Sequence, residues 1–119
     1  MEMIKVQVPK ALLAICNQVY EIEQRLKKTG IDSGVQRNVT KLKDALQELN
    51  LLYEDPSGQK YNETRSDLDA TISGERTDGL VVVEVIKPII KYRLSGAAGQ
   101  EFNHIIQKGV VIVQNKEGI

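Results

Sequence analysis

The stretch YEDPSGQKYNETRSDLDA, residues 53–70, separates two halves of the chain that follow different hydrophobic patterns. It is polar, and its residues Asp55-Pro56-Ser57-Gly58 have the composition of a β-turn, in which proline fixes φ and glycine relieves strain at the last position. Apolar residues recur at helical spacing before this stretch and in strand-like runs after it. Helices followed by strands, without alternation, predict an α+β fold.

The first half predicts two helices. One follows Pro9, which suits a helix start because its missing N–H is not needed there, and it ends at Gly30. The other opens at Ser33 or Gly34 and runs through residues 35–50. In each helix the apolar residues are spaced alternately three and four apart, which gives a narrow stripe on one face. The stripe residues are Leu12, Ile15, Val19, Ile22 and Leu26 in the first helix and Val35, Val39, Leu42, Leu46 and Leu49 in the second.

These narrow stripes leave two interpretations open. Two helices alone cover only part of each stripe, whereas four helices from two copies bury both, so we expect a homodimeric four-helix bundle with these residues at its seam. A chain of 119 residues also gains from the surface that a partner subunit would bury. Two heptads per helix fall short of a typical coiled coil, so helices packed on the following strands are the alternative.

The second half predicts a small antiparallel β-domain. Its strand-like runs are LDATI, GLVVVEVIKPIIKYRL and HIIQKGVVIVQ, residues 68–72, 79–94 and 104–114. Pro88 places the long run on a sheet edge or divides it into two strands with a bend. The expected organisation is a short N-terminal segment with strand-like alternation (1–8), a helical dimerisation hairpin (9–52), a connecting turn (53–67) and the β-domain (68–119).

The composition excludes several classes of partner and compartment. The 16 basic and 16 acidic residues balance, so no basic field is available for nucleic acid or an anionic membrane. The lone cysteine, Cys16, cannot form an internal disulfide and fits a reducing compartment. No apolar run is long enough for a signal peptide or a membrane span. We therefore expect a soluble cytoplasmic protein.

No arrangement of residues predicts catalysis or metal binding. His104 is the only histidine and Cys16 the only cysteine, which gives no transition-metal ligand set. Carboxylates such as Glu23 and Asp44 lie among predicted helix surface positions, which favours solvated faces over an acid/base pair. The SGAAGQ segment, residues 95–100, lacks the lysine and threonine of a phosphate loop and predicts a hairpin connection. We expect a binding protein, not an enzyme, with no cofactor.

Residues 33–62, SGVQRNVTKLKDALQELNLLYEDPSGQKYN, resemble the middle of GrpE proteins, the nucleotide exchange factors of DnaK-type chaperones. That family has a Glu-Gly-Val start to a short helix, then a Leu-rich helix, then an Asp-Pro-x-Gly turn followed by an aromatic residue and Asp or Asn. The matching residues are Gly34, Val35, Leu42, Asp44, Leu46, Asp55, Pro56, Gly58, Tyr61 and Asn62. Further likeness in segments 12–26, 68–72, 82–86 and 105–113 extends the resemblance over roughly residues 11–113.

The resemblance implies a homodimer whose short helices build a four-helix bundle and whose β-domain docks on the ATPase domain of a DnaK-type chaperone, promoting ADP release. The implied docking residues are Val83, Val85, Ile86, Pro88, Ile106, Lys108, Val110 and Val111. The long paired helix at the start of GrpE proteins has no counterpart, so the resemblance is to a short form.

The sequence departs from the GrpE pattern within the β-domain. The Gln-Lys-Gly-Tyr turn of the family is replaced by KPIIKY, residues 87–92. This departure falls where the family touches its chaperone. The alternative function is therefore a dimeric protein-interaction scaffold with the same fold and no exchange activity.

Overall fold

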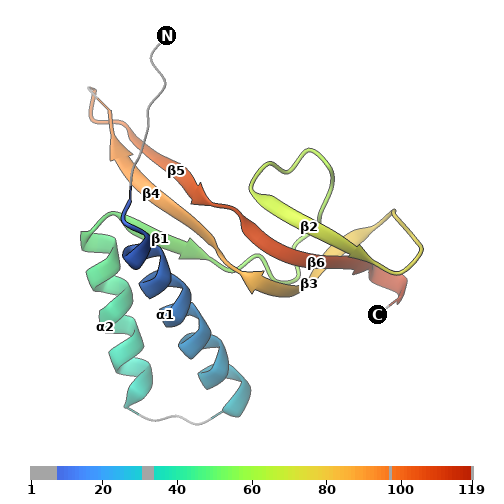
Figure 1. Cartoon of the computed structure of the whole chain (residues 1–119), viewed down its shortest axis with the longest axis horizontal. Helices are drawn as coiled ribbons and strands as arrows, with labels where there is room; N and C mark the ends of the chain where they lie inside the picture. The colour runs from blue at the N-terminus through green and yellow to red at the C-terminus, as the bar shows by residue number, and fades with distance from the viewer. Residues whose placement is uncertain (1–7, 31–33, 97, 119) are drawn as a thin grey trace. The chain divides into compact units, whose positions relative to one another are not determined.

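The computed structural model describes residues 8–30, 34–96 and 98–118, and the chain forms two compact units (Figure 1). The helical unit consists of the described part of Met1–Tyr53 together with Ile90–Ile106, and the β unit consists of Glu54–Ile89 and Gln107–Ile119. Two helices come first and strands follow, which confirms the α+β class. Of the N-terminal segment predicted at residues 1–8, all but Val8 lies outside the described residues.

The helices begin and end near the predicted signals. Helix α1 (Lys10–Thr29) starts directly after Pro9 and ends at Gly30, whose φ of 65° lets its N–H reach a carbonyl of the last turn at 3.2 Å. Helix α2 (Val35–Glu48) starts after Gly34. The other predicted start residue, at position 33, lies outside the described residues.

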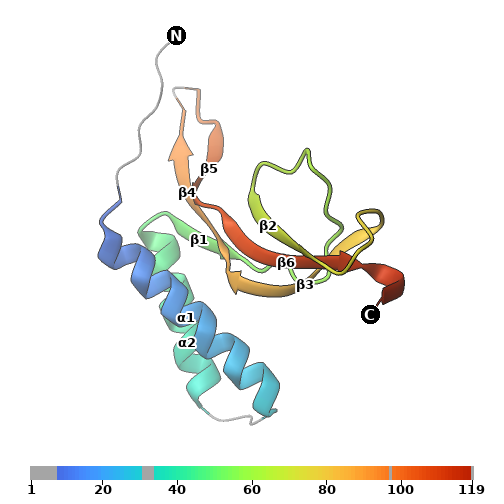
Figure 2. The same cartoon turned by 45° about the vertical axis from the view of Figure 1, so that its right-hand side comes forward.

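In the helical unit both helices pack on a three-stranded sheet of order β1-β4-β5 (Figure 2). Its strands are β1 (Leu51–Glu54), β4 (Ile89–Ser95) and β5 (Glu101–Gln107). The helices thus use part of their apolar stripes on strands of their own chain, which was the alternative interpretation of the stripes. The dimeric bundle stays a prediction. The buried core consists of Cys16, Val19, Val39, Leu46, Leu51 and Ile90.

The β unit contains a second three-stranded sheet, of order β2-β6-β3. Strand β2 (Leu68–Ser73) pairs in parallel with β6 (Gly109–Asn115), and β3 (Leu80–Lys87) pairs with β6 antiparallel. The sheet is therefore mixed, which corrects the prediction of a purely antiparallel β-domain. Strands β3, β4 and β5 lie between β2 and β6 along the chain and supply the long connection that a parallel pair requires.

The polar stretch between the two halves forms a turn and then pairs with the edge of strand β3. Asp55 accepts hydrogen bonds from the backbone N–H and the hydroxyl of Ser57, at 3.0 and 2.7 Å, and Gly58 has a φ of 77°. Gly58 then donates to the carbonyl of Val82 at 2.9 Å, and Lys60 forms a bridge with Val81. The segment after the turn therefore covers the first half of the free edge of β3.

The two long apolar runs are each divided into two strands. Pro88 separates β3 from β4, as one of its two predicted roles requires, and Lys108 separates β5 from β6, where one strand was predicted. Strand β1, which begins directly after the helical run, was not predicted.

The unit boundaries also differ from the predicted domain boundaries. Ile90 is fully buried in the core of the helical unit, so residues 90–106 belong there instead of with the β-domain predicted at 68–119.

Candidate interaction surfaces

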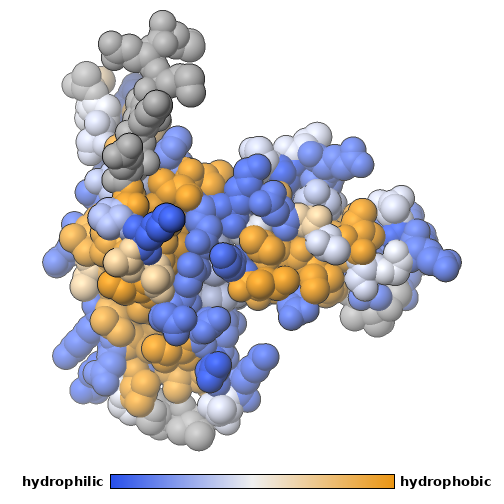
Figure 3. All heavy atoms as spheres, in the orientation of Figure 1, coloured by the Kyte–Doolittle hydropathy of each residue, from blue (hydrophilic) through white to orange (hydrophobic). Residues whose placement is uncertain are grey.

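The apolar stripes of the helices are divided between the core and the surface. Residues seven positions apart face outward: Ile15 and Ile22 on α1 are 45% and 39% exposed, and Leu42 on α2 is 44% exposed with Val35 and Leu49 similarly uncovered. The other seam residues turn inward, with Val19, Val39 and Leu46 buried and Leu12 and Leu26 half-buried. Figure 3 shows apolar atoms gathered over the helices. We call the five outward residues, Ile15, Ile22, Val35, Leu42 and Leu49, the outer stripe.

A half-buried polar cluster ties the two helices to β1. The Glu23 carboxylate accepts hydrogen bonds from Lys43 Nζ at 3.0 Å and from the Tyr53 hydroxyl at 3.2 Å. The Lys43 ammonium also lies 5.2 Å from the centre of the Tyr53 ring, and Tyr20 meets that ring edge-on at 5.8 Å. Glu23 was predicted to be a solvated surface residue, but its contacts with α2 and β1 depend on long-range packing that local sequence does not reveal.

Burial changes the acidity of two groups in the helical unit. The pKa of the Tyr53 hydroxyl is raised well above its usual value, first because the side chain is withdrawn from water and second because the Glu23 carboxylate repels a phenolate. Burial likewise raises the pKa of the Cys16 thiol. Both groups are therefore neutral at physiological pH. The Tyr53 hydroxyl serves the fold through its hydrogen bond to Glu23, and Cys16 is a buried thiol instead of a reactive thiolate.

Strand β3 exposes aliphatic side chains where its pairing is irregular. Its register against β6 shifts between Val82 and Glu84 and again between Val85 and Lys87, so Val83 and Ile86 are extra residues at two bulges. Val83 is 40% exposed and Ile86 is 53% exposed. Both are docking residues implied by the family resemblance, but the bulges that bring them to the surface have no signal in the sequence.

The other predicted docking residues differ in burial and belong to two units. Lys108 is exposed, and Val85 and Val110 are half-buried in the sheet of the β unit. Pro88 and Val111 are buried and contribute to the core of that unit. Ile106 belongs to the helical unit, where it packs against the core.

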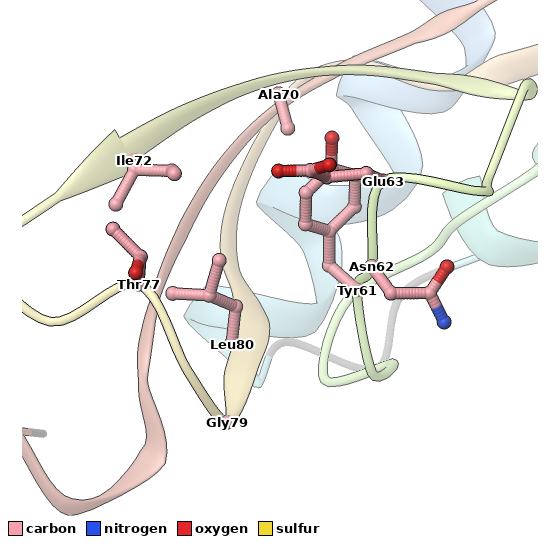
Figure 4. A pocket seen from close by; sticks show the side chains of 8 residues that line it. All are labelled: Tyr61, Asn62, Glu63, Ala70, Ile72, Thr77, Gly79 and Leu80. Carbon is pink, nitrogen blue, oxygen red and sulfur yellow. The ribbon is translucent and has the colours of Figure 1, made fainter.

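A hollow of about 620 Å³ lies on the sheet of the β unit and was not anticipated from the sequence (Figure 4). Ala70 and Ile72 of β2 bound one side, and Leu80 at the start of β3 bounds another. Its rim is completed by the loop residues Tyr61, Asn62, Glu63, Thr77 and Gly79. We call this feature the β2 hollow.

Charged side chains beside the hollow are held in ion pairs. Arg76 contacts the Asp78 carboxylate at 2.9 Å and the Glu117 carboxylate at 2.8 Å. The hydrogen bonds that Arg76 donates to Asp78 and, second, to Glu117 raise the pKa of its guanidinium, and the same arginine lowers the pKa of Asp78. Arg65 is bidentate on Asp67, at 3.0 and 2.8 Å.

Within residues 8–30, 34–96 and 98–118, no three His, Cys, Asp or Glu side chains gather as metal ligands, and no helix has the length and apolar character to cross a membrane. Comparison of the chain with protein-family models, curated proteins and solved structures gave no match. The outer stripe, the exposed residues of β3 and the β2 hollow are therefore candidate surfaces on structural grounds alone.

Proposed function

We propose that this chain is a GrpE-like nucleotide exchange factor: a cytoplasmic homodimer that binds the ATPase domain of a DnaK-type chaperone and promotes release of ADP. The proposal is supported by the order of elements, because the segments that resemble the family form a helix pair, a turn and then strands. The outer stripe supports the dimer, since it leaves apolar surface at seven-residue intervals on both helices.

The observation that carries the docking part of the proposal is the exposure of Val83 and Ile86 on one strand. Segment 82–86 is the one that resembles the Val-Val-Glu-Val-Leu strand of the family, and two bulges turn these aliphatic side chains outward. Neither side chain is buried in the unit's own core. A pair of exposed aliphatic residues on a rigid strand is suited to the apolar centre of a protein interface.

Exchange requires no chemistry from this chain. A factor that binds the nucleotide-free, open state of an ATPase more tightly than the closed state shifts the population towards opening, and ADP then leaves sooner. What the chain must supply is shape and apolar contact on one conformation of the partner. Val83 and Ile86 would provide that contact.

The test is release of a fluorescent ADP analogue from DnaK-type chaperones, measured in stopped flow with and without the chain. We expect the chain to accelerate release, and the double variant Val83→Ser with Ile86→Ser to lose most of the acceleration. Replacing two aliphatic anchors removes about 1 to 3 kcal/mol of interface energy, which weakens binding roughly ten- to a hundredfold.

The matched control is Ile72→Ser, which makes the same kind of change at a residue of β2 that is 43% exposed in the same unit. This variant should accelerate release as the wild type does. An unchanged release rate at saturating wild-type chain, across the DnaK-type chaperones of the source cell, contradicts the proposal. If the double variant and Ile72→Ser lost the acceleration equally, the loss would not be specific to Val83 and Ile86, and the docking residues would lie elsewhere.

The alternative is a dimeric interaction scaffold with this fold and no exchange activity, and one observation favours it. Where the family has a turn of small residues, Pro88 and Ile89 are buried, and the Pro88 carbonyl accepts a hydrogen bond from the Gln107 amide at 3.0 Å. Burial and this hydrogen bond mean that residues 88–89 stabilise the fold of the chain itself. On this alternative the chain dimerises and binds a protein through β3 without altering ADP release.

A further inference from the structure

Strand β2 forms an open edge of the sheet in the β unit. It pairs with β6 on one side only, and no other strand among the described residues pairs with its outer side. The backbone hydrogen bonds of the neighbouring loops do not reach residues 69–73 either, within the described part of the chain. This edge therefore presents a row of N–H and C=O groups to solvent.

The open edge has few of the features by which proteins usually protect edge strands, and Asp69 is its one charged residue. The register of β2 against β6 runs without a shift from Leu68 to Ser73, so no bulge twists it away, and its sequence, LDATIS, contains no proline or lysine. The opposite edge differs, because β3 carries two bulges and segment 58–61 pairs along its first half. Of the two edges of this sheet, β2 alone is regular and uncovered among the residues that the structure describes.

The β2 hollow lies beside this edge on one face of the sheet. Ala70 and Ile72 alternate on that face, and Figure 4 shows their side chains on the β2 side of the hollow, with Leu80 and Tyr61 on the other. Ile72 is a large aliphatic residue that the unit's own core does not cover. An aliphatic side chain from a strand added to β2 would bury this surface.

The charges around the edge favour a basic partner. Glu63 lines the hollow and has no ion-pair partner among the residues that the structure describes, while Asp69 on β2 has only Lys108 at 4.0 Å. Two arginines of this unit are engaged, Arg65 by Asp67 and Arg76 by two carboxylates, and Lys60 and Lys116 line an adjoining pocket instead of the hollow itself. Lysine or arginine beside the aliphatic residue would therefore meet unneutralised carboxylate.

We propose that the outer edge of β2 binds an extended segment of another protein, which adds as a strand, places an aliphatic side chain in the β2 hollow and carries a basic residue next to it. Main-chain hydrogen bonds to an edge strand supply affinity, and the hollow with its carboxylates supplies selectivity. This site is independent of the outer stripe and of the bulge residues of β3, so it does not depend on the proposed exchange activity.

The test uses a fluorescently labelled peptide in which valine alternates with threonine and a lysine stands at each end. Its affinity for the chain of 119 residues is measured by anisotropy, and its location by hydrogen exchange of residues 68–73. We expect slowed exchange of the β2 amides. A peptide N-methylated at its central residues, with the same side chains but fewer N–H donors, should bind at least about tenfold more weakly.

Substitutions in the chain test which of its side chains contribute to peptide binding. Ile72→Ser should weaken binding about tenfold, because it removes an aliphatic wall of the hollow. Glu63→Gln should reduce the affinity for the lysine-ended peptide and its dependence on salt, and should leave a glutamate-ended peptide unaffected or better bound. The double variant Val83→Ser with Ile86→Ser is the control and should bind as the wild type does.

Three results would overturn the proposal. The first is unchanged exchange of the β2 amides at the highest soluble peptide concentration. The second is equal affinity for the N-methylated and unmethylated peptides, which would exclude strand addition as the mode of binding. The third is concentration-dependent protection of β2 in the chain alone, which would make a second copy the occupant of the edge.

Discussion

Replacing Leu42 by Asp separates association of the helices from folding of the chain. Leu42 belongs to the outer stripe and is 44% exposed, whereas Leu46, one helical turn later, turns inward, is 5% exposed and lies in the core. The sequence placed both at a dimer seam. Only Leu42 retains surface that a second copy could bury, so a charge at the two positions should have different consequences.

The size of the effect follows from the uncovered surface. The exposed fractions of the outer stripe add up to roughly two fully exposed aliphatic side chains per chain, so closing two copies together would contribute about 7 to 13 kcal/mol. That range overlaps the cost of association, about 4 to 15 kcal/mol, and gives a dimer of moderate affinity. Two carboxylates at the seam each cost several kcal/mol, so Leu42→Asp should weaken the dimer roughly a thousandfold or more.

Sedimentation equilibrium over the micromolar range measures the association, and urea unfolding measures the fold. We expect a wild-type dimer and a folded Leu42→Asp monomer. Leu46→Asp should instead unfold the chain, because it buries an unpaired charge in the core. Thr40→Asp adds the same charge at an exposed position away from the stripe and should remain dimeric. A wild-type monomer, or a Leu42→Asp variant with unchanged mass, would refute the reasoning.

Three further predictions concern stability, each read by urea unfolding. Glu23→Gln removes the ion pair with the helix α2 lysine and should cost about 1 kcal/mol; an unchanged midpoint would show that the cluster contributes nothing. The folded state holds Tyr53 protonated above the usual pKa of 10.0, so the wild type should lose stability relative to Tyr53→Phe as pH rises beyond that value, by at most about 1.4 kcal/mol per pH unit; parallel pH profiles would contradict the raised pKa. Gly109→Ala should cost about 1 to 3 kcal/mol because its Cβ would lie 2.8 Å from Leu68, whereas Gly34→Ala, with nothing within 4 Å, should be neutral; equal stabilities would mean that the sheet adjusts.

The sequence was sufficient for features with a local cause. Gly30 ends α1 because its positive φ suits a left-handed cap, and the Asp55–Gly58 turn forms through a side-chain bond to Ser57, both of which are readable from residue types. The helical period likewise located both helices. The apolar stripes predicted that one helix face is buried but could not say against what.

The features that local pattern could not give depend on long-range pairing. Strand β1 is short and follows α2 so closely that its leucines fell within the predicted helical hairpin, 9–52, and Ile90 joins the helical core from a distant part of the chain. The parallel pairing of β2 with β6 is a matter of topology, which strand propensity does not encode. The bulges at Val83 and Ile86, on which the docking proposal rests, arise from register and not from a glycine or proline signal.

The most direct test of the proposed function is the affinity of the wild-type chain for the ATPase domain of a DnaK-type chaperone, measured by titration calorimetry with and without saturating ADP. Coupling between two ligands is reciprocal, so a factor that promotes ADP release must bind the ADP-loaded domain less tightly. We predict a loss of affinity of about tenfold or more on ADP saturation. Equal affinity in the two states would contradict exchange activity and leave the chain as a binding scaffold.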